Sequence, residues 1–521
     1  MRRSRARAPC AARVRPMPYA PPAQRPCRPR VFAGRSLEEM MALACPRVAG
    51  HLQAARRPTC APLLPRAPQR LARAAAPAAP RPLPPPLPRR PRAAGGAAAA
   101  GAPEPEQPAA AAAPAPTPAP AKKASKPRLP GLDSLRFFLI AYIGVGHFIS
   151  FATRDAFLLK LFTQINVWVG AFFVLSGYVA GYTATELGKF EASPRVKPEG
   201  AYTVARVAGF YPLFLLANIV FGWVFIFADL TYNGPIATFF HGLMSLTLTQ
   251  AWFPAHAEIW NAPTWFLSSL TFAMAVLPYA LPPLAALRKK GLKKALIALT
   301  AVSLLGKLAY SYDLNAWALL EGVTGPKAHP NQLLWNVTRF HPFYATLEVL
   351  MGVAAARLVM TDGVDDDGKP AGAPPPAGSA LLPALGLVAI TAARAAGWLT
   401  LNDPLTRALL FVPLFTVMVM RIHRNTLAGA KGLTAFLGLP LMTYLGTISF
   451  PIFILHGPIG QVFYKKLIAT KLWGAVVGPQ YFPLYLATVL VAAAAAQKFF
   501  LENKKVQEIS GNITKAITNA I

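Results

Sequence analysis

Arg136 and His147 lie eleven residues apart in an apolar stretch of the chain, LDSLRFFLIAYIGVGHFISFA, which begins at Leu132. In an α-helix eleven residues make about three turns and rise by about 16 Å, so both side chains share one helix face at different depths. A guanidinium can fork onto a phosphate, and a neutral imidazole can act as a base near pH 7. The spacing predicts a site where Arg136 holds an anionic, phosphorylated substrate whose reacting end reaches His147.

Two further ionisable side chains, Glu348 and His456, lie deep inside other apolar stretches. A titratable group at membrane depth usually faces a protein interior or a wet cavity and often serves function. Pro451 and Pro458 flank His456 and loosen its helix, which is tolerated beside a cavity. We predict catalytic roles for His147, His456 and Glu348. For Glu348, a hydrogen-bonded strut between helices is an equally supported role.

The chain as a whole is too apolar for a soluble protein of its size. Of its 521 residues, 54% are hydrophobic and 14% are charged, far from the balance of soluble domains. From Leu132 onward, apolar runs long enough to cross about 30 Å of hydrocarbon alternate with short polar breaks. We predict an all-α, polytopic membrane protein of about ten transmembrane helices, near residues 132–153, 161–185, 206–228, 263–285, 295–312, 340–360, 379–400, 405–421, 440–463 and 479–500.

Segment 236–252 is a possible eleventh span, and the basic residues between the spans argue against it. Cytoplasmic connections carry an excess of Lys and Arg. With ten spans and the basic N-terminus inside, the basic loops near 186–205, 286–294 and 421–435 all fall on that side. An eleventh crossing would place the basic cluster after Leu287 on the wrong side. The segment is therefore expected to be re-entrant or to lie in the membrane interface.

The net charge of +32 is divided unevenly along the chain. Residues 1–130 hold 24 Lys and Arg against four acids, a net of +20, and the rest of the chain holds 29 against 17, a net of +12. Charge interrupted by apolar runs is typical of membrane loops and not of a continuous nucleic-acid groove. The cysteines all lie within residues 1–130 as well, so the apolar body has no disulfide framework or thiolate metal site. We expect the lipid bilayer as a partner, no nucleic acid and no metal.

Residues 1–130 are predicted to be a disordered Ala/Pro/Arg-rich tail, because they cannot bury a core. Their Arg-rich, acid-poor composition resembles an organelle transit peptide that begins at Met1 or Met41. A compositionally biased, partly mis-started reading frame is an equal alternative. The compartment thus stays open between an organelle envelope, such as that of a plastid, and the endomembrane or plasma membrane. Residues 131–502 form the predicted transmembrane domain, and 503–521 a short C-terminal tail.

Six sequence blocks in this body carry a family resemblance. The chain resembles the acyltransferase 3 family of polytopic enzymes, whose opening helix has an Arg-(ten residues)-His motif. The match spans residues 131–458, with the blocks in the family's order: LDSLRFFLIAYIGVGH from Leu132, FFVLSGYV from Phe172, Arg206 six residues before Pro212, NAPTWFLSS from Asn261, Arg339 with FHPFYATLEVLMG, and LGTISFPIFILH from Leu445.

The resemblance implies roles for the matching residues. His147 would be the general base toward an acceptor hydroxyl, or would carry the acyl group covalently. Arg136 and Arg206 would bind the donor's phosphates. Structural or pocket roles fall to Asp133, which can orient Arg136, to Ser176 and Gly177, which serve close packing, and to Trp265. The chain departs from the family pattern at Gly209, Phe266 and Leu270, where many members carry arginine, serine and glutamate.

The function implied by the resemblance is that of a membrane-embedded O-acyltransferase. It would move an acyl group, acetyl being the expected one, from acyl coenzyme A to a hydroxyl of a carbohydrate, a lipid or another small acceptor. Acyl coenzyme A would be a co-substrate, and no cofactor would be bound permanently. Two other functions stay open. The buried His and Glu would also suit a proton-coupled transporter of small solutes, and the departures at Gly209 and Leu270 would suit a catalytically impaired family member that acts as a membrane scaffold.

Overall fold

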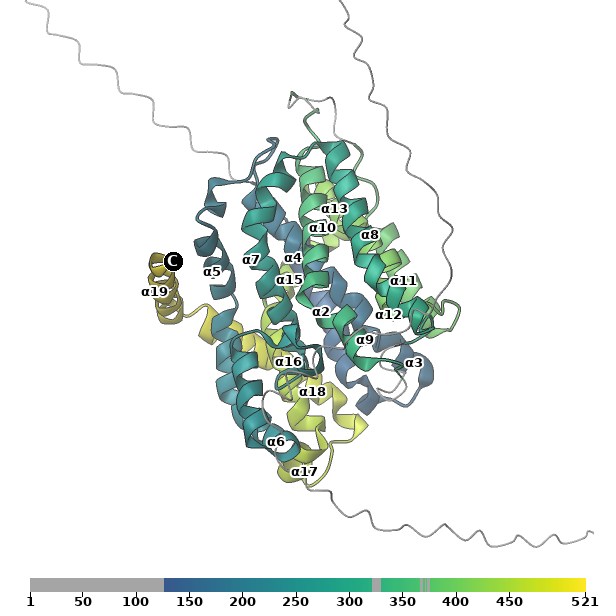
Figure 1. Ribbon diagram of the computed structural model, residues 1–521, viewed down its shortest axis with the longest axis vertical. Coiled ribbons are helices and arrows are strands. Elements are labelled where there is room, and N and C mark those ends of the chain that lie inside the picture. Colours follow the sequence, from purple (N-terminus) through teal and green to yellow (C-terminus); the bar gives the residue numbers. More distant parts are fainter. Residues whose placement is uncertain (1–125, 321–328, 366–368, 371, 373–374) are drawn as a thin grey trace, which may run out of the picture. The chain divides into compact units, whose positions relative to one another are not determined.

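The computed structural model describes residues 126–320, 329–365, 369–370, 372 and 375–521. Residues 1–125, which make up most of the predicted tail, lie outside this part. All regular structure among the described residues is helical, and the β-bridges found there, at Thr185–Ala192 and Val364–Pro370, are isolated. The prediction of an all-α membrane protein is confirmed (Figure 1).

Eight helical stretches of the described chain are long and apolar enough to cross a membrane. They are α2 (Pro130–Ala152), α3 and α4 (Ala156–Phe162, Ile165–Ala184), α6 (Tyr211–Leu246), η4 and α7 (Ala262–Thr264, Trp265–Ala286), α8 (Lys289–Asp313), α9 and α10 (Gln332–Phe340, Pro342–Met360), α12, η6 and α13 (Asp403–Thr406, Arg407–Phe411, Val412–Leu427), and η7, α18 and η8 (Pro479–Tyr481, Phe482–Ala495, Ala496–Leu501).

A ninth crossing exists if α15 (Pro440–Thr447) and α16 (Ser449–Tyr464) count as one broken span, bent by 52°. The predicted span at 379–400 forms α11 (Leu381–Ala395), which has only 15 residues. At 1.5 Å per residue it is about 22 Å long, short of about 30 Å of hydrocarbon. By length and composition, the prediction of about ten spans becomes eight or nine in the described part of the chain.

Helix α6 folds back on itself at Gly234, whose φ of 79° breaks the helical path just before Pro235. The Tyr211 hydroxyl donates to the Leu246 carbonyl at 3.0 Å, although the two residues stand at opposite ends of α6. The two arms therefore run side by side (Figure 1). The returning arm is about 18 Å long and too short to cross, in agreement with a re-entrant 236–252. It continues into η2 (Gln250–Trp252) and η3 (Pro254–His256).

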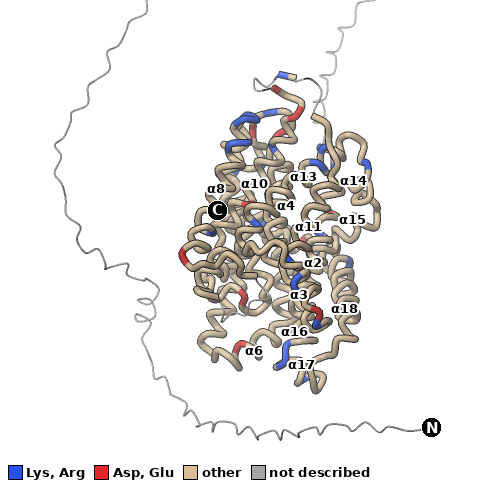
Figure 2. The backbone as a smooth tube through the Cα atoms, turned by 90° about the vertical axis from the view of Figure 1, so that its right-hand side faces the viewer, with Lys and Arg blue, Asp and Glu red and all other residues tan. Residues whose placement is uncertain are grey.

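Lys and Arg residues gather at the end of the bundle where α8 begins (Figure 2). The Arg288 guanidinium lies 3.9 Å from the centre of the Phe190 ring, which joins the loop after α4 to the start of α8. Lys289 donates to the Asp362 carbonyl at 3.4 Å, and Arg424 pairs with the Asp362 carboxylate at 2.7 Å. The three basic loops thus share one end of the bundle, as the topology prediction requires.

The boundary of the body differs from the prediction at both ends. Residues 126–129, assigned to the tail, pack on α4: the Lys126 ammonium donates to the carbonyls of Tyr182, at 2.8 Å, and Thr185. Burial lowers the pKa of this ammonium below its ordinary value. The predicted C-terminal tail, 503–521, forms the amphipathic helix α19 (Lys504–Ala520), which lies against α5 (Glu199–Ala208). Hydrogen bonds from Lys126 and the buried Leu129 hold the first segment, and an apolar face on α19 explains the second.

The centre of the body is the close crossing of α4 and α10. A Cβ added at Gly177 would lie 1.8 Å from the Val349 carbonyl oxygen, and one added at Gly352 would lie 2.0 Å from that of Val174. No side chain fits at either position, so the two backbones meet directly. Small residues permit such contacts between membrane helices, where packing replaces the hydrophobic effect as the driving force.

We expect Gly352→Ala to lower the stability of the protein by about 1–3 kcal/mol, because α10 must move away from α4 to admit a methyl group. Thermal unfolding in detergent, followed by tryptophan fluorescence, measures the change. Gly222→Ala in α6 is the matched control, since a Cβ there meets nothing within 4 Å. Equal melting temperatures for the two variants would contradict the role of the crossing.

The shared basic end predicts the pattern of cysteine labelling in a variant whose four native cysteines are replaced. Cysteines introduced at Lys197 and Lys290 should react with a membrane-impermeant maleimide from the same side. A cysteine at the exposed Thr231, near the turn of α6, should react from the other side. Labelling of positions 197 and 290 from opposite sides is the result that this topology forbids.

Candidate active site

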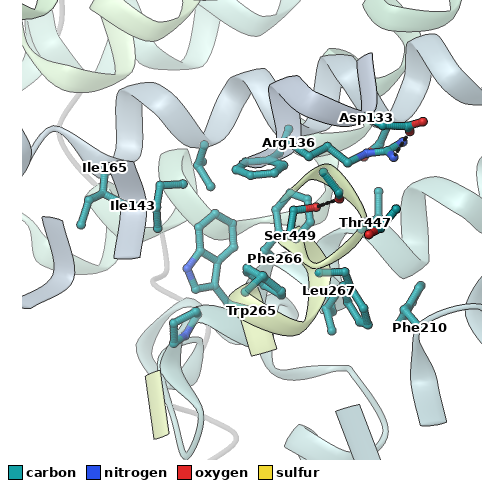
Figure 3. A pocket seen from close by; sticks show the side chains of 18 of the residues that line it. Asp133, Arg136, Ile143, Ile165, Phe210, Trp265, Phe266, Leu267, Thr447 and Ser449 are labelled. Carbon is teal, nitrogen blue, oxygen red and sulfur yellow. Dashed lines mark hydrogen bonds and ion pairs between the residues drawn. The ribbon is translucent and has the colours of Figure 1, made fainter. Parts of the chain in front are cut away.

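An inner cavity of about 460 Å³ lies between α2, α4, α7 and the break that separates α15 from α16. Asp133 and Arg136 stand on its α2 side, with Trp265, Phe266 and Leu267 of α7 across from them (Figure 3). The structure brings six of the predicted site residues to this cavity: Asp133, Arg136, His147, Ser176, Trp265 and, through a hydrogen bond to His147, the buried His456.

The charged groups at the mouth of the inner cavity are two guanidiniums and one carboxylate. Arg136 pairs with Asp133 at 2.8 Å, one helical turn away, and Arg128 approaches the other oxygen of Asp133 at 3.6 Å. Arg136 is one-third exposed and Arg128 is mostly exposed. The mouth therefore carries net positive charge, with Arg136 held in place by its neighbour.

His147 lies three turns deeper on α2, where its side chain is open to the inner cavity. Its Nδ1 lies 3.0 Å from Nε2 of His456. Nδ1 of His456 lies 2.9 Å from the Phe453 carbonyl and 3.1 Å from that of Ile452. Carbonyls only accept, so this Nδ1 carries the proton, and in an uncharged pair His147 donates through Nδ1. The Nε2 lone pair of His147 is then left for a substrate.

Helix α16 is shaped to hold His456 behind His147. Pro458 has no N–H, so the Ile454 carbonyl loses its helical partner. Asn261 fills the gap by donating to that carbonyl at 3.0 Å. A Cβ added at Gly457 would lie 2.7 Å from the Asn261 Oδ1 atom, so the glycine lets the asparagine approach. The hydrogen bond from Asn261 explains why α16, although loosened at Pro458, still holds the His456 imidazole in a fixed position.

The remaining walls of the inner cavity are mostly apolar, with hydroxyls from Ser176, Thr447 and Ser449 among them. Phe266 and Leu270, two of the positions where the chain departs from the family pattern, line it, as do Trp265 and Ser176. The Trp265 ring packs against Phe340, with centres 4.7 Å apart. Among the described residues no three His, Cys, Asp or Glu side chains are grouped as metal ligands would be. The chemistry of the cavity thus depends on one imidazole and the arginines at its mouth.

Glu348, for which a catalytic role is predicted, is not among the residues that line the inner cavity. Its carboxylate pairs with the Arg407 guanidinium, with Nε 2.8 Å from Oε1, and Lys307 stands 4.0 Å from the same oxygen. Arg407 also donates to the side-chain oxygen of Asn166 at 3.1 Å. All three charged groups are almost fully buried. Glu348 therefore ties α10, η6, α8 and α4 together, the alternative role that its sequence position left open.

Arg206 also lies away from the lining of the inner cavity. Its guanidinium donates to the Thr183 hydroxyl at 3.0 Å and packs over the Tyr202 ring. Thr183 lines an outer hollow of about 750 Å³, which shares Arg128 and Asp133 with the inner cavity and is also lined by Lys126, Glu186 and Arg195. Arg206 is thus positioned at the edge of a basic vestibule outside the mouth.

Several of these residues escaped the sequence analysis. Arg407 and Lys307 lie within the predicted spans 405–421 and 295–312, and their partner Glu348 holds them inside the bundle. Arg394 and Asp403 form a second buried pair. Arg128 fell within the predicted tail. For Arg128 a signal existed, because it stands five residues before the Asp133 carboxylate in the sequence. For Arg407 and Lys307 the pairing with Glu348 depends on helix packing.

The burial of Glu348 predicts a structural phenotype. Glu348→Gln should lower stability by about 3–5 kcal/mol, because it leaves two buried cations without a carboxylate. Its turnover per folded molecule should fall far less than that of His147→Ala. Glu502→Gln, at an exposed carboxylate, is the control. A Glu348→Gln protein as stable as the wild type yet inactive would return Glu348 to a catalytic role.

The comparison with protein families agrees with this geometry. The family model of the acyltransferase 3 domain, described as an acyltransferase domain, matches residues 129–497. No curated protein and no solved structure matches the chain. The match covers the whole bundle that builds the inner cavity, including Arg136, His147 and His456. The chain therefore belongs to the acyltransferase 3 family of membrane acyltransferases.

Proposed function

We propose that the chain transfers an acyl group, acetyl in the first place, from acyl coenzyme A to a hydroxyl of an acceptor. The observation that carries this proposal is His147, which lines a mostly apolar cavity, has no hydrogen bond to Nε2 among the described residues, and lies below a mouth that bears Arg128 and Arg136. A base below and cations above suit a donor with a thioester at one end and phosphates at the other.

The donor would enter from the basic end of the bundle. Its phosphates would lie on Arg136 and Arg128, with the nucleotide in the outer hollow near Lys126 and Arg206. The flexible arm between diphosphate and thioester would then cross the roughly 16 Å that separate Arg136 from His147 along α2. Guanidiniums are well suited to this task, since they fork onto phosphate oxygens and stay charged.

The reaction would proceed as general base catalysis. The acceptor hydroxyl gives its proton to Nε2 of His147 as its oxygen attacks the thioester carbonyl, and the carbon–sulfur bond breaks once the tetrahedral intermediate collapses. The proton on Nε2 then passes to the departing thiolate, so the imidazole is restored. His456 acts as a positioning residue: by accepting from Nδ1 it fixes the tautomer in which Nε2 is the base.

Loss of His147 and loss of Arg136 should have different kinetic effects. His147→Ala should cut turnover by about 10²–10⁴-fold, the usual range for a proton-transfer group, and leave donor binding nearly intact. Arg136→Ala should weaken donor binding by about 2 kcal/mol, roughly thirtyfold, and Arg136→Lys should restore part of it. Release of free thiol from acetyl coenzyme A and binding of a nonhydrolysable donor analogue, measured in matched liposomes, separate the two effects.

Arg154→Ala provides a control, since Arg154 follows the far end of α2 and lines neither the inner cavity nor the outer hollow. Equal donor-dependent turnover by wild type and His147→Ala would remove His147 as the base. His456→Gln should show an intermediate loss, because the amide can still accept from Nδ1 of His147 but places its oxygen less well.

A further inference from the structure

An apolar groove of about 730 Å³, the α19 groove, lies between α19 and a wall formed by α5 and the start of α6 (Figure 1). Residues within 203–219 of this wall and within 506–517 of α19 line it, and none of its described lining residues is charged. The groove adjoins the inner cavity, because Phe210 lines that cavity and Tyr211, the next residue, lines the groove. It shares no lining residue with the inner cavity or the outer hollow.

Helix α19 contacts the body at both ends but does not close over its length. Phe500, which precedes the helix, packs against the main core of the bundle. At the other end Ile521 touches α5, since a Cβ added at Gly200 would lie 2.7 Å from Cγ2 of Ile521. Between these contacts Ile509 and Ile513 line the groove, yet they are 60% and 56% exposed. The middle of α19 thus borders an open apolar gap and not a packed interface.

Three of the four hydroxyls that line the α19 groove donate to carbonyls of the protein. Thr203 and Thr514 each donate to the carbonyl four residues earlier in the same helix, at 3.1 and 2.7 Å. Tyr211 donates to the Leu246 carbonyl at 3.0 Å. Water and hydroxyl-rich ligands need several polar partners in a site, and these walls offer them few. The groove therefore favours an apolar occupant.

The α6 wall of the α19 groove continues into a surface that faces the bilayer. Leu215 and Ile219 line the groove, and Trp223 and Ile226 follow them at helical spacing on the same face of α6. Ile219, Trp223 and Ile226 are 69%, 52% and 42% exposed. Because α6 is long and apolar enough to cross the membrane, lipid chains cover this face. An acyl chain that lies along α6 therefore has a continuous apolar surface into the groove.

Positive charge lies at the end of α19 that follows the last crossing. Lys504 and Lys505 are exposed, and Val506, the next residue, lines the groove. The last crossing ends at Leu501, just before these lysines. The whole of α19 holds three lysines against one glutamate, a net charge of +2. Amphipathic helices with lysines on the polar face are attracted to anionic lipids. A lipid phosphate therefore suits the lysines at the end of this groove.

We propose that the α19 groove binds one phospholipid with an anionic headgroup, taken from the surrounding bilayer. One acyl chain lies between α19 and the wall of α5 and α6, and the headgroup lies at Lys504 and Lys505. The lipid covers the exposed isoleucines of α19 and joins this helix to the body. Because Phe210 and Tyr211 are consecutive, the lipid also supports one wall of the inner cavity. The site does not depend on the proposed acyl transfer.

The test places the full chain in phosphatidylcholine nanodiscs that contain a trace of phosphatidylglycerol with a photoactivatable diazirine in its acyl chain. After irradiation, mass spectrometry locates the labelled residues. We expect label within 203–219 and 506–517 that excess unlabelled phosphatidylglycerol removes and the same excess of phosphatidylcholine does not. Val491 of α18, which is 70% exposed and outside the groove, is the internal reference for labelling by bulk lipid.

Two variants separate the acyl chain from the headgroup. Ser510→Trp should lower labelling of the groove about tenfold relative to Val491, because the indole takes the space of the chain. Asn512→Trp, at an exposed position of α19 outside the groove, is its control. Replacement of both Lys504 and Lys505 by alanine should weaken competition by phosphatidylglycerol about thirtyfold. Replacement of Lys293 and Lys294, two exposed lysines of α8, should leave it unchanged.

Three results would overturn the proposal. One is groove labelling that phosphatidylcholine removes as well as phosphatidylglycerol does. Another is equal groove labelling in wild type and Ser510→Trp. The third is a groove without label in a protein whose Val491 is labelled, because the groove is then closed or filled by something other than lipid. Thermal unfolding gives a second measurement: phosphatidylglycerol should raise the melting temperature of wild type and of Asn512→Trp, but not that of Ser510→Trp.

Discussion

A polar group inside a membrane protein must find a partner, because the surrounding hydrocarbon offers none. His147 meets this constraint in two ways at once: Nδ1 bonds to His456, and the side chain lines the inner cavity. The bond to His456 fixes the ring, and the cavity leaves the second nitrogen open for chemistry. A histidine inside a membrane protein costs free energy unless its ring nitrogens find partners. The same need for a partner fixes the orientation of the His147 ring.

The same rule explains the cluster around Glu348. The carboxylate of Glu348 pairs with Arg407 and Lys307, and the side chain of Asn166 accepts a further hydrogen bond from Arg407. Four helical elements meet in this region. Buried ion pairs add little net stability over apolar packing, but breaking one is costly. The cluster therefore specifies how α10 sits against its neighbours more than it strengthens the bundle. A transporter would use a proton relay that joins Glu348 to the histidines. This arrangement does not favour such a relay, because the Glu348 carboxylate is paired with the guanidinium of Arg407.

Much of the fold follows from the sequence, since hydropathy and charge depend on local composition. The eleven-residue spacing correctly places Arg136 and His147 along one cavity, because helical periodicity fixes the shared face. The basic loops indicate a common end, because cytoplasmic connections carry an excess of Lys and Arg. Segment 236–252 could be recognised as non-crossing only from charge balance, whereas its return along α6 depends on the φ of Gly234.

What the sequence could not provide are contacts between residues far apart in the chain. His147 and His456 are separated by 309 positions, and their hydrogen bond sets the tautomer on which the mechanism depends. The side chain of Glu348 is of a type that can act as a catalytic acid. Only the packing of η6 reveals that Arg407 lies beside it. Likewise, α11 is apolar enough for a span, but its helix ends after 15 residues at Ala395.

Two of the departures from the family pattern change the polarity of the inner cavity. Phe266 and Leu270 stand on its wall, so the space beside His147 is bounded by rings and aliphatic groups where many family members have polar ones. An apolar wall gives few sites to water and does not compete with a hydroxyl for Nε2 of His147. Under the proposed function, a thioester held there would be shielded from hydrolysis until an acceptor arrives.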